Sequence, residues 1–328
     1  MSPMAINSCI EKLYHPVVDF GIALCAESPN AKIHYPGIML ELKQMKTLMD
    51  YILSAKEHGV AIGHFNVSDS EGFKAVVEGA KELGVPVIVG VSEGERDFIG
   101  LYEVVALVKT ARENGLPVFI NADHTYSVEK AKIAIDAGVD AVIIDGADKT
   151  FDENVLMTKE VVEYAKSKGN GTLVEAELGF IGKSSKMLEE IPEGVSEATQ
   201  TKPEDAVRFI EATGIDLFAP SVGNIHGIVK GGEPDLNIER IKAVAAAVGV
   251  PLVLHGASGN SDQDLVASID AGIRIIHINT ELRMAYKEGI EEGLKSGEVA
   301  PYKFLAEGEA RMKAVVLEKL KIFNKLNK

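Results

Sequence analysis

Cysteine, long apolar runs and positive charge are all scarce in this chain of 328 residues. The two cysteines, Cys9 and Cys25, form no CxxC pair, which favours a reduced cytosolic compartment. No apolar run approaches the roughly 20 residues of a membrane helix, and the N-terminus lacks a signal-peptide pattern. The net charge of -15 disfavours nucleic acid and anionic membranes as partners. We therefore expect a cytoplasmic protein that binds neither.

A recurring pattern divides most of the chain into units of one strand and one helix. A helix-like stretch ends at a glycine, which accepts the left-handed conformation that closes a helix, and a short β-branched run follows. The runs are nearly all apolar, as in parallel strands that are buried on both faces. The glycines are Gly59, Gly84, Gly115, Gly138, Gly169, Gly214, Gly249 and Gly272.

Eight such units predict a closed (β/α)8 barrel, the TIM barrel fold. The alternative is a doubly wound open sheet, but no GxGxxG motif follows the first strand here. Residues 1–37 precede the first unit and are expected to form an N-terminal extension. Residues 38–328 are expected to form the catalytic barrel, which ends in a C-terminal helix at roughly 305–323.

Three histidines stand just past three of the predicted strands, namely His124, His226 and His255. The carboxyl ends of all barrel strands meet at one rim, where barrel enzymes hold their active sites. Imidazole is a common zinc ligand. A single histidine there would more often be a hydrogen-bonded surface residue, but three together predict a divalent metal site. His64, inside the first strand, is most simply a satisfied interior residue.

Carboxylates accompany these histidines. Asp123 directly precedes His124, where it would support a ligand, act as an acid or base, or simply cap a turn. Glu175 and Glu177 alternate on the fifth strand and so share one face. A carboxylate inside an apolar strand is costly to bury without a partner. We expect that partner to be a metal or a ring of donors, with a structural ion pair as the alternative.

Two loops have the composition of a phosphate site. The segment HGASG, residues 255–259, follows the seventh strand, and HINTEL, residues 277–282, ends the eighth. In barrels the loops after these two strands, with adjacent helix N-termini, commonly bind phosphate. His277 shares a strand face with Asn279, so it either lines the barrel mouth or packs structurally.

Lysine is absent from all eight predicted strands. Aldol chemistry on a barrel can use a Schiff-base lysine, which must lie on a buried strand. A barrel that stabilises a carbanion without such a lysine needs a metal as Lewis acid.

In this order, the motifs GHFNVSD, INADH, VIIDGA, VEAELGFIG, VGNIHG, LVLHGASG and INTELR make the chain resemble the class II, metal-dependent ketose-bisphosphate aldolases. The resemblance runs from about Leu40 to Phe323. It implies a lyase of glycolysis and gluconeogenesis that reversibly cleaves fructose 1,6-bisphosphate through a metal-stabilised enediolate. The products would be dihydroxyacetone phosphate and glyceraldehyde 3-phosphate. Tagatose bisphosphate or another phosphorylated ketose is the alternative substrate, and a homodimer or homotetramer is implied.

The resemblance also implies a role for each matched residue. His124, His226 and His255 would bind Zn²⁺, for which Co²⁺ or Fe²⁺ could substitute, with Glu177 as a nearby or alternate ligand. Asp123 would be the acid/base at the C4 hydroxyl. The remaining substrate contacts would come from Asn66 and Ser92 to hydroxyls, from Gly227, Gly256, Ser258, Asn279 and Thr280 to the phosphate of dihydroxyacetone phosphate, and from Arg283 to the second phosphate. Carbonyl oxygens around Gly227 and Gly256 would suit Na⁺ or K⁺.

The chain departs from the family pattern at two places. A lid after the fifth strand usually reads GGxE, and its glutamate is the proposed C3 base, but Ser185 stands there instead. Glu189 or Glu190 from the longer lid is our hypothesis for the replacement. His277 stands where the family usually has an asparagine that touches the enediolate region, which bears on the aldehyde range.

Two other functional classes fit a barrel with a metal site. Metal-dependent hydrolases commonly begin with an HxH pair on the first strand, but GHFNV has a single histidine. A non-catalytic barrel that binds phosphometabolites would need neither the full histidine set nor Asp123, and this chain has both. The sequence therefore favours the aldolase.

Overall fold

The computed structural model describes residues 32–35, 38–41, 46–182 and 185–326, which fall into two compact units divided after Lys46. In the first unit, β1 (Lys32–Tyr35) pairs antiparallel with β2 (Ile38–Glu41). Of the predicted extension (residues 1–37), residues 1–31, 36 and 37 lie outside the described residues. β2 lies within residues 38–328, which the sequence predicted to form the barrel, but it pairs with β1 instead of a barrel strand.

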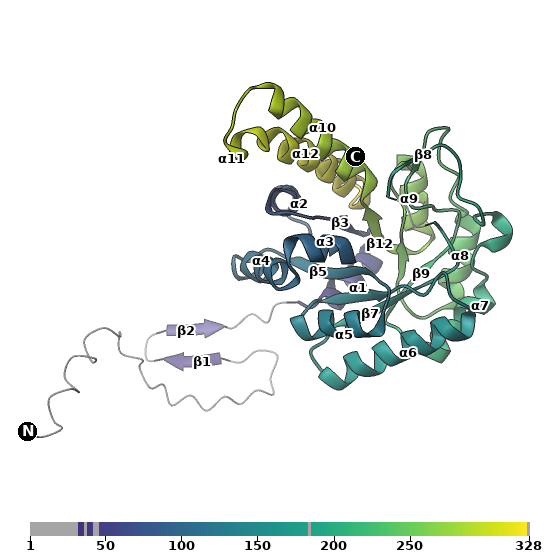
Figure 1. Cartoon of the computed structure of the whole chain (residues 1–328). Helices are drawn as coiled ribbons and strands as arrows, with labels where there is room; N and C mark the ends of the chain where they lie inside the picture. The colour runs from purple at the N-terminus through teal and green to yellow at the C-terminus, as the bar shows by residue number, and fades with distance from the viewer. Residues whose placement is uncertain (1–31, 36–37, 42–45, 183–184, 327–328) are drawn as a thin grey trace, which may run out of the picture. The chain divides into compact units, whose positions relative to one another are not determined.

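Eight parallel strands close a barrel in the second unit (Figure 1). Each strand pairs with the next in the barrel, and the last pairs with the first. Every strand overlaps a run that the sequence predicted, and only β5 and β12 extend one residue beyond theirs, so the (β/α)8 TIM barrel is confirmed. The strands are β3 (Ile62–Asn66), β4 (Val87–Val91), β5 (Val118–Thr125), β6 (Ala141–Ile144), β7 (Leu173–Leu178), β9 (Leu217–Pro220), β11 (Leu252–Leu254) and β12 (Ile273–Ile278).

Helices follow the strands and pack around the barrel. Asp69, Ser127 and Ser261 cap three of them by accepting backbone N–H groups of the first turn. No helix of the described residues is long and apolar enough to cross a membrane. The helices are α1 (Leu48–His58), α2 (Ser70–Leu83), α3 (Glu93–Ile99), α4 (Leu101–Glu113), α5 (Val128–Ala137), α6 (Phe151–Lys168), α7 (Pro203–Thr213), α8 (Ile238–Ala247), α9 (Asp262–Ala271), α10 (Thr280–Lys295), α11 (Pro301–Phe304) and α12 (Ala306–Phe323).

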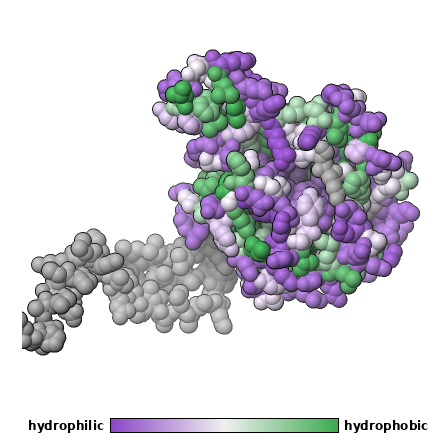
Figure 2. All heavy atoms as spheres, in the orientation of Figure 1, coloured by the Kyte–Doolittle hydropathy of each residue, from purple (hydrophilic) through white to green (hydrophobic). Residues whose placement is uncertain are grey.

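The C-terminal helix α12 packs against α2, β3 and α10, and it begins and ends close to the predicted bounds. α10 and α12 lie side by side and extend away from the barrel strands (Figure 1). Figure 2 shows hydrophobic residues grouped at the far end of this pair, where Leu294, Val299 and Tyr302 are exposed. The homodimer or homotetramer that the family resemblance implies stays a prediction.

The barrel interior changes from apolar to polar along the strands. Near their N-terminal ends, Ile62, Ile88 and Phe119 pack with the buried face of α1. Further along the same strand faces, His64 and Glu175 are buried, and so are other polar side chains. A buried polar group without a hydrogen-bond partner costs free energy. A polar layer at the carboxyl rim therefore indicates a ligand site.

The lid between β7 and α7 is tied to the loop after β9. Its two-residue strand β8 (Met187–Leu188) pairs in parallel with β10 (Ile228–Val229), and a short 3₁₀ helix, η1 (Glu197–Thr199), follows. Lys230 also donates to Glu189 at 2.5 Å. The lid thus lies beside the loop that carries His226. Residues 183 and 184 lie outside the described residues.

Candidate metal centre

A bulge at the end of β5 brings two neighbouring side chains to the same rim. The register between β5 and β6 shifts between Ala122 and Thr125, and His124 has a φ of 34°. Such a left-handed conformation is rare for a residue other than glycine. In a regular strand, consecutive side chains point to opposite faces. Because of the bulge, Asp123 Oδ1 and His124 Nε2 lie 3.8 Å apart at the barrel mouth.

The buried guanidinium of Arg96, from α3, holds this bulge. It donates to the carbonyl oxygens of Val91 and Asp123 at 2.6 and 3.0 Å, and to Thr125 Oγ1 at 3.0 Å. These contacts bridge the ends of β4 and β5. Arg96 therefore fixes the backbone from which Asp123 and His124 extend.

Replacing Arg96 with methionine is expected to lower zinc affinity about ten- to hundredfold, the usual range for losing a group that orients a ligand. Arg112→Met is the matched control, because Arg112 also donates to a β5 carbonyl, that of Val118 at the opposite end of the strand. Competition with a chromophoric chelator measures both affinities. Equal zinc affinities in the two variants would show that Arg96 does not position the site.

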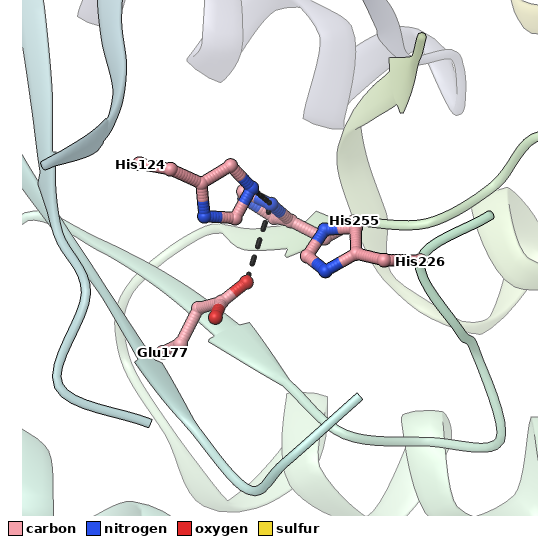
Figure 3. A group of neighbouring side chains, drawn as sticks. All are labelled: His124, Glu177, His226 and His255. Carbon is pink, nitrogen blue, oxygen red and sulfur yellow. Dashed lines mark hydrogen bonds and ion pairs between the residues drawn. The ribbon is translucent and has the colours of Figure 1, made fainter. Parts of the chain in front are cut away.

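Three imidazoles and one carboxylate converge at the rim (Figure 3). His124 Nε2 lies 3.4 Å from His255 Nδ1, and Glu177 Oε1 lies 3.2 Å from the same nitrogen. The His226 ring centroid is 4.7 Å from that of His124. The ligand atoms of all four residues lie within 4.8 Å of one another. This spacing brings the predicted ligand set together around one point.

The second nitrogen of each imidazole is held by an acceptor. His124 Nδ1 lies 2.9 Å from Asp145, His226 Nδ1 lies 2.8 Å from the Gly182 carbonyl, and His255 Nε2 lies 2.7 Å from Glu175. An acceptor on the outer nitrogen places the proton there and turns the bare lone pair of the other nitrogen inward. The donor set fits a divalent cation, and imidazole with carboxylate suits zinc.

The charges of the cluster also match a cation. Burial and the charge of His124 lower the pKa of His226 to about 4 and that of His255 well below its usual value. Burial opposes protonation of His124, but the charge of Asp123 and the hydrogen bond to Asp145 raise its pKa to about 10. Burial raises the pKa of Glu175 to about 8 and that of Glu177 well above its usual value. The imidazolium of His124 therefore faces the ionised Asp123 and Asp145, whose pKa values are lowered, in the place where a metal ion would carry the positive charge.

Zinc affinity is expected to rise about tenfold for each unit between about pH 7 and pH 9. Because the pKa of His124 is raised to about 10, the metal-free cluster is protonated throughout this window, and zinc must displace that proton. The dependence should disappear above pH 10. Chelator competition across this range measures it, and an affinity that does not change with pH would contradict the assignment of His124.

The predicted phosphate residues line one inner cavity together with His124, His226 and His255. Gly227, Gly256, Ser258, Asn279 and Thr280 surround it, together with Asn66, Asp123 and His277. α10 begins at Thr280, so the positive end of its dipole faces this cavity. At Gly256, φ is +59° and an added Cβ would lie 2.2 Å from the Ile225 carbonyl oxygen. Only glycine fits this turn.

Asp123 is held by a side-chain amide. Asn66 Nδ2 donates to Asp123 Oδ2 at 2.8 Å and to Glu95 Oε2 at 2.9 Å. Burial opposes ionisation, but His124, His64 and His255 keep the pKa of Asp123 below its usual range. Asp123 is therefore an ionised acceptor that is fixed at one oxygen, while Oδ1 has no hydrogen-bond partner among the described residues.

The two lid glutamates of the sequence hypothesis lie in different places. Glu190 lines a larger outer cavity together with Ser185. Glu189 is bound to Lys230, its side chain is 81% exposed, and it lines neither cavity. The geometry thus favours Glu190 over Glu189 as the group that reaches substrate.

The expectation that His64 is a satisfied interior residue is wrong. Both of its ring nitrogens are buried without a hydrogen-bond partner among the described residues. Its ring instead stacks on His277 with centroids 3.4 Å apart. This arrangement needs Gly90, because a Cβ there would lie 2.0 Å from the His64 ring. His277 lines the inner cavity, with Nδ1 3.6 Å from Asp123 Oδ1.

Sequence reasoning missed four residues that surround the site, namely Glu95, Arg96, Tyr126 and Asp145. Asp145 follows the apolar run VII at the end of β6, the same signal that identified Asp123. The other three lie in loops or helices, where nothing in the local pattern sets them apart.

Comparisons with known proteins show which family the chain is similar to. Residues 46–328 match the family model for class II fructose-bisphosphate aldolase. A fructose-bisphosphate aldolase of Staphylococcus aureus is 36% identical over 288 residues, which cover 86% of this chain and 98% of that protein. A probable fructose-bisphosphate aldolase of Bacillus subtilis is 37% identical over 287 residues, with the same coverage.

The crystal structure of the YdjI aldolase from Escherichia coli K12 has the same fold. It matches with a TM-score of 0.73 at 33% identity, covering 85% of this chain and 97% of that one. By sequence and by structure, this chain belongs to the class II fructose-bisphosphate aldolases, a family of metal-dependent carbon–carbon lyases.

Proposed function

We propose that the chain is a zinc-dependent aldolase that cleaves a phosphorylated ketose to dihydroxyacetone phosphate and an aldehyde. The relatives' names give fructose bisphosphate as their substrate, so fructose 1,6-bisphosphate is the first sugar to test, and tagatose 1,6-bisphosphate is the second. One observation carries the proposal. Three imidazoles turn their free nitrogens toward one point, each with its other nitrogen held, directly beside Asp123 and the inner cavity.

Each residue group has a part in the cleavage. The phosphate of the substrate would bind where the Gly256 turn meets the N-terminus of α10. Zinc, when bound by His124, His226 and His255, would supply a Lewis acid at the ketone oxygen. Asp123, ionised and fixed by Asn66, accepts the C4 hydroxyl proton as the C3–C4 bond breaks. The Na⁺ or K⁺ site near Gly227 and Gly256 stays a prediction.

The test is the formation of dihydroxyacetone phosphate from fructose and tagatose bisphosphates and from their 1-phosphates. We expect turnover that a chelator abolishes and added zinc restores, and cobalt and iron(II) can be compared in the same assay. Release of inorganic phosphate instead would indicate a hydrolase. Binding of the sugars without turnover would indicate a phosphometabolite-binding barrel. Either result would refute the proposal.

One exchange measurement tests whether a lid glutamate is the base. Dihydroxyacetone phosphate exchanges a proton with solvent at the carbon that becomes C3 of the ketose, here called the C3 proton. Glu190 lines the outer cavity, so Glu190→Gln is expected to slow this exchange about 10²–10⁴-fold, the usual contribution of a general base. Glu189→Gln is the matched control one residue away, and we expect exchange near the parent rate. Proton NMR in deuterated buffer measures both rates. If neither variant slows exchange, the lid does not supply the base.

A further inference from the structure

The outer cavity adjoins the proposed metal centre, because His124 and His226 line it. Its volume is about 710 Å³, within the range of roughly 300–1,000 Å³ of pockets that enclose drug-sized ligands. It shares His124, Ser185, His226 and Asn279 with the inner cavity. When the phosphorylated end of a ketose occupies the inner cavity, the carbons beyond C3 therefore extend into the outer one.

Arg283, one of the cations that line this cavity, is already paired with a carboxylate. Arg283 donates to Glu95 Oε1 at 2.6 Å. The Glu95 side chain is 7% exposed, whereas that of Arg283 is 47% exposed. The other oxygen of Glu95 accepts from the Ser92 N–H at 2.7 Å and from Asn66 at 2.9 Å. A buried carboxylate held by three donors thus neutralises Arg283 and repels a second anion placed there.

The remaining walls also disfavour a second phosphate. The other cations among the described residues that line the cavity are Lys186 and the His124 imidazolium. Three carboxylates, those of Asp145, Glu190 and Glu193, line it as well. Phe180 and Ile191 add apolar surface. The described charges give no excess of positive charge to hold a dianion, whereas carboxylates and backbone groups are good partners for hydroxyls.

We propose that the outer cavity takes an uncharged, hydroxylated tail, so that the preferred substrate is a ketose 1-phosphate without a second phosphate. This inference rests on the proposed function and specifies its substrate class. Arg283, which the sequence assigned to the second phosphate, instead fixes Glu95 and through it Asn66 and Asp123.

The experiment compares kcat/KM of the zinc-loaded full chain for fructose 1-phosphate with fructose 1,6-bisphosphate, and for the corresponding tagatose pair. For whichever sugar is cleaved, fructose or tagatose, we expect kcat/KM for the 1-phosphate to be at least as high as kcat/KM for the bisphosphate. A higher kcat/KM for the bisphosphate would overturn this inference, but the proposed aldolase function would still stand. If none of the four sugars gives dihydroxyacetone phosphate, the proposed function itself fails, and the inference fails with it.

Two variants test the role of the ion pair. Arg283→Met is expected to change kcat/KM for both sugars by the same factor, whereas a selective loss of ten-fold or more on the bisphosphate would overturn the inference. Glu95→Gln should free Arg283 and shift the ratio toward the bisphosphate by about ten-fold. The matched control is Glu93→Gln on the same helix, because Glu93 pairs with Lys130 instead. An equal ratio in both glutamine variants would also contradict the proposal.

Discussion

Replacing His255 with alanine is expected to abolish zinc binding at micromolar metal and to lower the cleavage rate at least about 1,000-fold, or about 4 kcal/mol. His255 is 1% exposed, and its Nδ1 lies 3.4 Å from His124 Nε2 and 3.2 Å from Glu177 Oε1. Its Nε2 is bound to Glu175, so the variant also leaves a buried carboxyl unpaired. Metal content after dialysis and initial rates with excess zinc measure the two effects.

His58→Ala is the control for this variant. His58 lies at the exposed end of α1, where its Nδ1 is 2.7 Å from the Ser54 carbonyl oxygen, so its loss should change neither quantity. Circular dichroism at the assay temperature shows whether the His255 variant remains folded. A folded His255→Ala protein that kept stoichiometric zinc and normal rates would remove this histidine from the metal site.

Replacing Asp123 with asparagine is expected to separate two steps of the reaction. The amide has the shape of the carboxylate and can still accept from Asn66, so the site keeps its geometry. It cannot take a proton from the C4 hydroxyl, and cleavage should fall about 10²–10⁴-fold. Zinc affinity should change much less, and C3 proton exchange in dihydroxyacetone phosphate should persist, because neither depends on the C4 hydroxyl.

Single-turnover cleavage and NMR exchange measured on the same preparation decide the role of Asp123. If cleavage and exchange fall by the same factor, Asp123 serves the C3 proton or the general geometry of the site. If both stay at the parent rate, it has no part in proton transfer. Asn66→Ala gives a useful comparison, because it frees the carboxylate without removing it.

The sequence carried enough information for the barrel and for the clustering of three histidines at its rim. Short apolar runs separated by glycines at regular places specify buried parallel strands, and such strands share one carboxyl rim. Once His124, His226 and His255 each follow a strand, the topology alone brings them together. Glu177 could be predicted for a related reason, because a carboxylate within an apolar strand needs a partner.

The contacts that hold those residues depend on tertiary structure, which a local pattern does not encode. Arg96 matters because α3 places its guanidinium against the ends of β4 and β5. The pairing of Glu95 with Arg283 joins residues 188 positions apart. His64 resembled any buried strand residue, and its role beside His277 depends on the space that Gly90 leaves.

Anomalous diffraction at the zinc edge, from crystals soaked in zinc, shows whether the three rim histidines bind one metal ion. We predict one strong peak about 2.0–2.1 Å from the free ring nitrogens of His124, His226 and His255. The described residues contain a second group, His64, Asp123 and His277, whose ligand atoms also lie close together. A peak at that group instead, or no site shared by the three rim histidines, would contradict the proposed metal centre.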